Sequence, residues 1–354
     1  MSVWRWADRY SPLIPDEHCL SLGEGQTPCI RSRSIGADLG IRDLFFKLES
    51  ANPSGSYKDR FAALAVSHMR ANREHTCLAT SSGNTGSALA AYCAAARIRC
   101  RIAVVESAPS AKLQQMLAHG AEIQRVREFG TNASVTGCVF ERLEAKSRQR
   151  GFALQISAFR YSPLGMQGVE SIAFELQEQV PGQTGNVFCP AGGGGLTLAV
   201  ARGFVKANGL ASVHCVQPEG NDTIASALRK GSDEARHVRC STKISGLQVA
   251  NVIDGNEVIA ACRESGGTGH TVSDQQIFDA QKLLARAEGI FSEPAGAVSL
   301  AGALQAARRG ELDPEVPVVC LITGSGFKDS SSIDAMNADT ECPVVTADAM
   351  FAED

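Results

Sequence analysis

The sequence has little excess of either charge, few aromatic residues (6%) and no long apolar run. Charged residues make up 20% of its 354 residues and the formal net charge is −4. This composition excludes a disordered chain and lacks the basic character of a nucleic-acid-binding protein. No segment approaches the ~18 apolar residues of a membrane span, and the N-terminus lacks the apolar core of a secretory signal. We therefore expect a cytoplasmic globular protein with neither a nucleic-acid nor a membrane partner.

The acidic charge is concentrated at the C-terminus. Residues 334–354 contain six Asp and Glu residues and no Lys or Arg, so this tail carries −6 and the rest of the chain +2. A chain of 354 residues fits one large domain or two closely packed ones.

Paired cysteines are also absent. The 12 cysteines are scattered singly from Cys19 to Cys342, without a Cys-x-x-Cys pair or a histidine at zinc-finger spacing. We expect them to be reduced and mostly buried, and to form no metal site.

Short β-rich runs alternate with longer Ala-rich segments of helical period from residue 44 onward. This order predicts an α/β fold with a largely parallel sheet. The predicted strands are 44–48, 76–80, 101–105, 122–126, 152–155, 186–189, 213–216 and 316–322, and the predicted helices are 58–73, 87–97, 110–119, 131–150, 165–179 and 195–208.

Three glycine-containing turns follow predicted strands, at the sheet edge where doubly wound folds bind ligands. They are Ser81–Gly86, Ala191–Leu196 and Thr323–Gly326. The second holds four consecutive glycines before a helix, and their uncovered N–H groups suit a phosphate. The same run is equally compatible with a turn where two backbones cross closely. A P-loop and a dinucleotide fingerprint are both absent.

Lysine is scarce, with 9 residues against 25 arginines, and Lys58 lies in the first turn of a predicted helix. The helix dipole disfavours a cation there, so the amine should deprotonate more easily and act as a nucleophile. The alternative is a surface lysine paired with an acid. The turn 81–86 offers donors for a substrate carboxylate, or simply an N-cap. Thr323 offers a hydroxyl to a ring nitrogen, or is an ordinary turn residue.

Segment 52–60, Asn-Pro-Ser-Gly-Ser-Tyr-Lys-Asp-Arg, resembles the lysine motif of threonine synthases, which are fold type II pyridoxal-phosphate enzymes. Segments 3–6, 22–28, 82–85, 288–295 and 322–329 resemble threonine synthases in the same order. The resemblance implies a tryptophan synthase β-like fold of two parallel-sheet α/β domains with the cofactor between them. Residues 1–58 and 159–333 would form the larger, cofactor-binding domain, residues 59–158 the smaller mobile domain, and 334–354 an acidic tail.

The resemblance also implies the role of each cofactor-binding residue. Lys58 would form the Schiff base with pyridoxal 5'-phosphate and then move protons as an acid and base. Asn84 would hydrogen-bond the phenolic oxygen, and Thr323 would meet the pyridine nitrogen. The residues that would hold the cofactor phosphate are Gly192, Gly193, Gly194, Gly195 and Leu196.

The sequence departs from the family where the substrate would bind. Threonine synthases carry an Asn-Pro-Tyr-Arg segment whose Arg grips the phosphate of O-phosphohomoserine, but stretch 159–163 has no Arg at that place. Arg160, displaced by two residues, or another basic side chain would have to replace it. Ser82 and Thr85 would lie near the substrate carboxylate. The all-glycine phosphate loop is more like that of threonine and serine dehydratases.

We therefore expect a pyridoxal-phosphate-dependent lyase of amino-acid biosynthesis, acting on an activated amino acid by elimination and replacement. O-phosphohomoserine, converted to threonine, or a related substrate would be used. The alternative is a threonine or serine dehydratase (ammonia-lyase), although the tail is too short for the regulatory domain that many of them carry. A non-catalytic cofactor-binding protein is disfavoured because Lys58 is present together with Ser82, Asn84 and Thr85 on the substrate side. We also expect a homodimer.

Overall fold

The computed structural model describes residues 2–249 and 251–350, whose strands form two sheets. One sheet has six strands in the order β1-β2-β10-β7-β8-β9, with β1 antiparallel to β2 and the other pairs parallel. The other has four parallel strands in the order β5-β4-β3-β6. The strands are β1 (Cys29–Arg31), β2 (Leu44–Leu48), β3 (Thr76–Thr80), β4 (Arg99–Val105), β5 (Glu122–Val126), β6 (Phe152–Leu154), β7 (Asn186–Pro190), β8 (Ser212–Pro218), β9 (Gly269–Val272) and β10 (Val318–Ile322).

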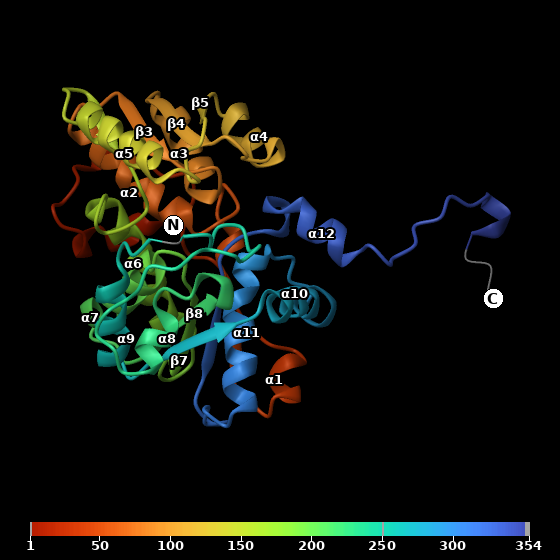
Figure 1. Ribbon diagram of the computed structural model, residues 1–354. Helices are drawn as coiled ribbons and strands as arrows, with labels where there is room; N and C mark the ends of the chain where they lie inside the picture. The colour runs from red at the N-terminus through yellow and green to blue at the C-terminus, as the bar shows by residue number, and fades with distance from the viewer. Residues whose placement is uncertain (1, 250, 351–354) are drawn as a thin grey trace.

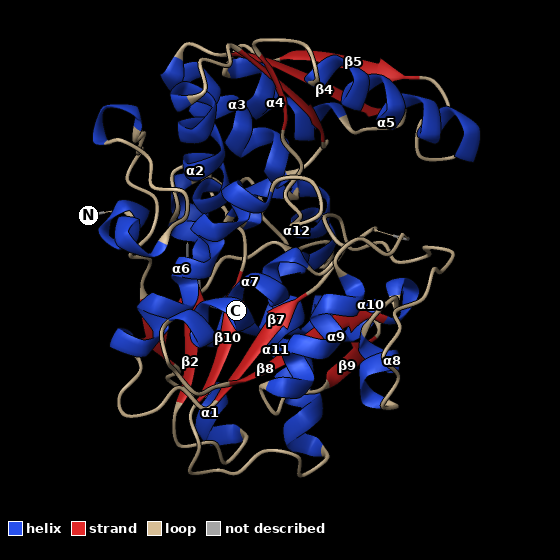
Figure 2. Cartoon of the chain, turned by 90° about the vertical axis from the view of Figure 1, so that its left-hand side faces the viewer, coloured by secondary structure: helices blue, strands red, loops and turns tan. Residues whose placement is uncertain are grey.

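The helices connect these strands and cover both sheets (Figures 1 and 2). They are α1 (Ile35–Asp38), α2 (Lys58–Ala71), α3 (Asn84–Ala96), α4 (Ser110–Ala118), α5 (Ala133–Ser147), α6 (Pro163–Gln179), α7 (Gly195–Lys206), α8 (Ala225–Arg229), α9 (Gly255–Glu264), α10 (Asp274–Leu283), α11 (Pro294–Arg308) and α12 (Ser330–Met336). None of the helices in the described residues is long and apolar enough to cross a membrane.

Helices α2 and α6 lie between the two sheets (Figure 2). The sequence of α2 has an apolar stripe, yet every residue from Asp59 to Met69 is buried because α3 and α6 pack against it. The approach of α6 is very close: a Cβ atom on Gly168 would lie 2.1 Å from the carbonyl oxygen of Arg60. Glycine at this position therefore sets how closely the two helices pack.

Alternate residues of β10 belong to two different hydrophobic cores. Val319 and Leu321 join a core that continues through α6 and α2 into the four-stranded sheet. Cys320 and Ile322 pack on the other face, with α10 and α11. Burial of both faces explains why the strand is apolar throughout, as expected for a central parallel strand.

The predicted α/β fold is confirmed. All eight predicted strands and six predicted helices are present with ends shifted by a few residues, whereas β1 and β9 were not predicted. Both are short edge strands, with too few residues for a periodic signal. The four strands of the smaller sheet fall within residues 59–158. The exact domain boundaries and the mobility of the smaller domain remain predictions.

The structure also shows the state of the cysteines and the course of the C-terminal tail. In the described residues the cysteines are free, and seven of the 12 are buried. After α12 the chain runs away from the body of the molecule (Figure 1).

Candidate active site

The predicted functional turns meet at the carboxyl edge of the central strands. The segment before Lys58 is fastened to the turn after β10: the N–H of Tyr57 donates to the carbonyl of Thr323 (3.0 Å), and the N–H of Ser325 donates to the carbonyl of Gly55 (2.9 Å). Gly55 has φ of 89°, a conformation that favours glycine. These contacts place Lys58 and Thr323 at the same edge of the sheet.

The other residues of segment 52–60 build the support for Lys58. Asn52 accepts a hydrogen bond from the N–H of Gly25 (2.9 Å). Asp59 accepts from both the N–H and the hydroxyl of Ser54, at 3.0 and 2.7 Å. Most of this segment therefore shapes the loop that precedes Lys58.

Arg60 extends this support into the interior. Its guanidinium is fully buried and bridges the carboxylates of Glu49 and Glu175, at 2.7 and 2.5 Å. Lys47, also fully buried, pairs with Glu175 at 2.5 Å. This network ties the start of α2 to β2 and α6.

Lys58 is the first residue of α2, as predicted, and is only partly exposed. Its ammonium donates to the hydroxyl of Ser157 and lies 4.4 Å from the centre of the Tyr57 ring. Burial lowers the pKa of Lys58 to about 7, and the charges of Glu293 and Asp254 oppose this shift. The amine is thus readily deprotonated, but burial is the principal cause, rather than the helix dipole considered from the sequence.

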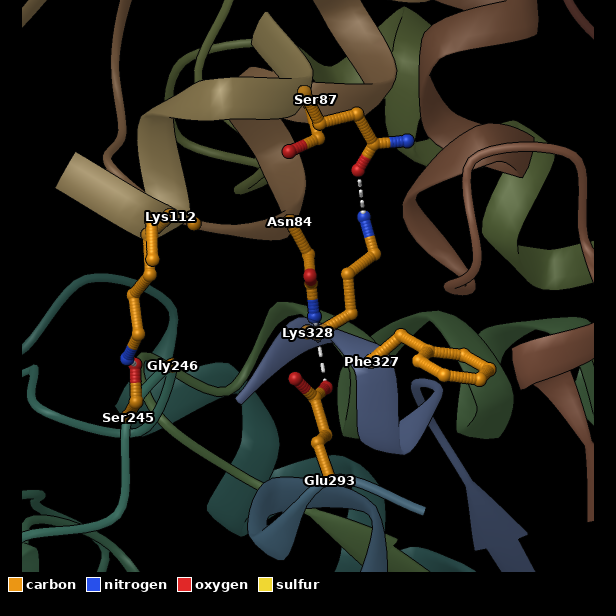
Figure 3. Close-up of a pocket in the computed structure, with 11 residues that line it drawn as sticks. Asn84, Ser87, Lys112, Ser245, Gly246, Glu293, Phe327 and Lys328 are labelled. Atoms are coloured by element: carbon orange, nitrogen blue, oxygen red, sulfur yellow. Dashed lines mark hydrogen bonds between the residues drawn. The ribbon is translucent and has the colours of Figure 1, made fainter. Parts of the chain in front are cut away.

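Asn84 lies at the start of α3 and donates to a carboxylate oxygen of Glu293 at 2.8 Å (Figure 3). Glu293 is 6% exposed, and burial raises its pKa to about 7, opposed by the hydrogen bond from Asn84. Sequence reasoning assigned no role to Glu293. The available signal was its position before Pro294, where it is the N-cap residue of α11.

The glycine loop joins β7 to α7. Gly194, with φ of 96°, is the N-cap residue of α7 and makes no side-chain cap, so the first N–H groups of this helix are left for a ligand. A Cβ atom on Gly194 would lie 2.6 Å from Val258. The loop therefore needs glycine there and forms a bare backbone cradle suited to a phosphate.

One carboxylate lies beside this cradle. Asp254 accepts hydrogen bonds from the N–H groups of Phe159 and Arg160, at 2.9 and 3.1 Å. A Cβ atom on Gly195 would be 3.2 Å from its oxygen. Burial raises the pKa of Asp254. Asp254 thus anchors segment 159–160 against the cradle, a role that its sequence position did not indicate.

A cavity opens between α3, α4 and the turn after β10 (Figure 3). Two lysines line it besides Asn84 and Glu293. Lys112 contacts the hydroxyl of Ser245 and pairs with Asp329 at 3.3 Å. Lys328 donates to Gln115 at 2.5 Å, and burial lowers its pKa. Two lysine side chains thus line this cavity together with Glu293.

The structure places the remaining predicted residues as follows. Ser82 and Thr85 flank Asn84 and are partly exposed, and Thr323 is buried at the end of β10. The side chain of Arg160 is exposed, lies 5.7 Å from the Tyr161 ring centre and lines a different cavity. The side chain of Arg160 therefore does not line the cavity that Asn84 lines.

The chain matches the family model described as pyridoxal-phosphate dependent enzyme over residues 20–324. It belongs to this family. The cofactor of this enzyme is accordingly pyridoxal phosphate, and the bare cradle, the uncapped helix and the readily deprotonated Lys58 fit it. The expected fold class, family and cofactor are all confirmed.

Individual proteins are similar to this chain over most of its length. A threonine synthase of Methanocaldococcus jannaschii is 31% identical over 338 residues, covering 93% of this chain and 81% of the relative. A threonine synthase of Halalkalibacterium halodurans is 30% identical, covering 94% and 92%. Among solved structures, an L-serine ammonia-lyase of Rhizomucor miehei has a TM-score of 0.74 at 22% identity, covering 90% and 99%. The structural likeness concerns the fold, whereas the sequence likeness identifies a threonine synthase-like lyase.

Proposed function

We propose that this enzyme converts an amino acid with an anionic leaving group, O-phosphohomoserine or a close analogue, by elimination and replacement. The observation that carries the proposal is one sheet edge that brings together Lys58, the glycine loop and Thr323, beside a cavity with two lysines. Its likeness to threonine synthases supports the reaction type. A cytoplasmic location and a homodimeric assembly, both expected from the sequence, are part of the proposal.

The residues that would hold the cofactor are those predicted from the sequence. The Lys58 amine would hold its carbonyl carbon, the loop 192–196 its phosphate, Thr323 its ring nitrogen and Asn84 its phenolic oxygen. When bound, pyridoxal phosphate withdraws electrons from the α-carbon of the amino acid. Ser82 and Thr85, at the start of α3, would hold the substrate carboxylate.

Proton movement is the task of Lys58. With a pKa of about 7, its amine can both accept and release a proton near neutral pH. The hydroxyl of Ser157 orients the amine. Glu293, also with a pKa of about 7, holds Asn84 in place. The pair thus fixes the amide that is to contact the cofactor.

A phosphate leaving group needs positively charged partners, because it brings close to two negative charges into the site. Arg160 points away, but Lys112 and Lys328 line the cavity next to Asn84. We propose that these two lysines take the place of the arginine that other threonine synthases carry. Ammonium groups bind phosphate as point charges, so this replacement is chemically sound.

The test compares kcat/KM for O-phosphohomoserine, serine and threonine in the wild type and in Lys112→Met and Lys328→Met. Losing one charged hydrogen bond to phosphate is expected to lower kcat/KM for the phosphorylated substrate by about 10- to 100-fold. Lys230→Met replaces an exposed lysine that does not line this cavity. It serves as the control, and its kcat/KM should equal that of the wild type.

Three results would contradict the proposal in different ways. Unchanged kcat/KM in both cavity variants would remove the lysines from the phosphate site. A loss in Arg160→Ala instead would show that this side chain turns inward. Release of ammonia from serine or threonine in preference to threonine formation would favour the dehydratase alternative.

A further inference from the structure

Three cysteines that are far apart in the sequence meet in the interior of the smaller sheet. Cys77 lies on β3, Cys93 on α3 and Cys100 on β4, and their sulfur atoms are all within 4.8 Å of one another. Cys77 and Cys100 are register partners on adjacent parallel strands, so both face α3. All three are buried, with exposed fractions of 0%, 0% and 6%.

The cluster lies away from the cofactor site. Cys93 is in the last turns of α3, whereas Asn84 and Ser87, which line the cavity, are in its first turn. Within the described residues, no hydrogen bond joins the three sulfurs to a residue given a role in the reaction. The cluster therefore needs an explanation of its own.

The three thiols also lie within hydrogen-bond reach of one another, so they form one contiguous group of sulfur donors.

The donor set selects the class of ion. Thiolate sulfur favours soft ions, and zinc in structural sites takes four ligands, whereas this cluster offers three sulfurs. Three sulfurs at bond lengths of about 2.3 Å from a central ion would lie about 4 Å apart, and the three sulfurs here all lie within 4.8 Å of one another.

We propose that Cys77, Cys93 and Cys100 form a three-coordinate site for a soft monovalent ion, Cu⁺. Binding forms up to three Cu–S bonds, and each thiol that binds as a thiolate releases its proton to solvent. No electron is transferred, since copper enters as Cu⁺. A single positive charge neutralises one thiolate, which limits the charge buried in the interior. The bound ion would link α3 to β3 and β4.

The experiment titrates the fully reduced holoenzyme with Cu⁺ under anaerobic conditions against a competing chromophoric chelator. One equivalent is expected to bind in the wild type with an ultraviolet sulfur-to-copper band and a raised unfolding temperature. Cys93→Ala should lower the affinity at least 10-fold. Cys262→Ala is the matched control, because Cys262 is another fully buried helical cysteine, and it should bind as the wild type does.

The result distinguishes a Cu⁺-binding site from a group of buried core cysteines that binds no ion. Failure of the wild type to bind Cu⁺, in protein whose 12 thiols all titrate after denaturation, overturns the proposal. So does equal loss of binding in Cys262→Ala and Cys93→Ala. If Cys93→Ala does not fold, Cys100→Ala replaces it in the same comparison.

Discussion

Replacement of Arg60 by methionine tests the support that the buried network gives to Lys58. The guanidinium donates four hydrogen bonds to Glu49 and Glu175, at 2.7, 2.8, 2.5 and 2.7 Å. In Arg60→Met, Glu175 keeps its ion pair with Lys47, but Glu49 is left buried without a cation. Breaking a buried pair from one side costs about 3–5 kcal/mol, which is the expected loss in the free energy of unfolding.

The assay is urea unfolding followed by circular dichroism, with cofactor absorbance as a second signal. At a slope of about 3 kcal/mol per molar urea, the midpoint should fall by roughly 1–1.7 M. Combining Arg60→Met with Glu49→Gln should recover much of the loss, because the unpaired charge is removed. Arg42→Met, which breaks exposed ion pairs with Glu315 and Asp43, is the control and should leave the midpoint nearly unchanged.

The same network gives a pH dependence with a definite sign. Burial alone would raise the pKa of Glu175, but the charges and hydrogen bonds of Arg60 and Lys47 outweigh it and lower the pKa to about 2. In the unfolded chain the value is about 4.3. The contribution of Glu175 is therefore complete above that value and is lost as the pH falls toward 2. If Arg60→Met costs less than about 1 kcal/mol and leaves this acid limb unchanged, the reasoning about the network is wrong.

Three further predictions concern Lys58, the smaller domain and a buried histidine pair. Lys58→Ala should abolish covalent attachment of the cofactor, and peptide mapping after borohydride reduction of the wild type should find the label on Lys58 alone; a label on another lysine would refute the assignment. A bound substrate analogue should slow hydrogen exchange at residues 81–86 as the smaller domain closes, and exchange rates that stay the same would argue against closure. The ring nitrogens of His214 and His270 lie 3.3 Å apart, and burial lowers their pKa values to about 4 and 3. Because unfolded histidine titrates near 6.5, the free energy of unfolding should fall as the pH falls from about 6.5 toward 3, and His214→Gln should flatten this slope; an equal slope in both proteins would contradict it.

The sequence by itself determined the class of fold and the family, and it is the basis for proposing Lys58 as the cofactor lysine. These depend on signals that are local in the chain: strand and helix periods, glycines before helices, and the motif around Lys58. A loop that is to hold a phosphate needs glycine where the backbone adopts a positive φ, as at Gly194, and this requirement depends only on neighbouring residues. Such features can be recognised without knowing how distant segments pack.

Only the tertiary structure decided which side chains share a site. Glu293 bonds Asn84 across 209 residues of sequence, and Lys328 reaches Gln115 across 213. The cysteine cluster likewise depends on the register of β3 against β4 and on the rotation of α3 above them. Arg160 shows the reverse case: its place in the sequence suggested a phosphate ligand, but its side chain is exposed beside Tyr161 and lines a different cavity. Tertiary packing sets these distances, so they cannot be inferred from the composition of any single segment.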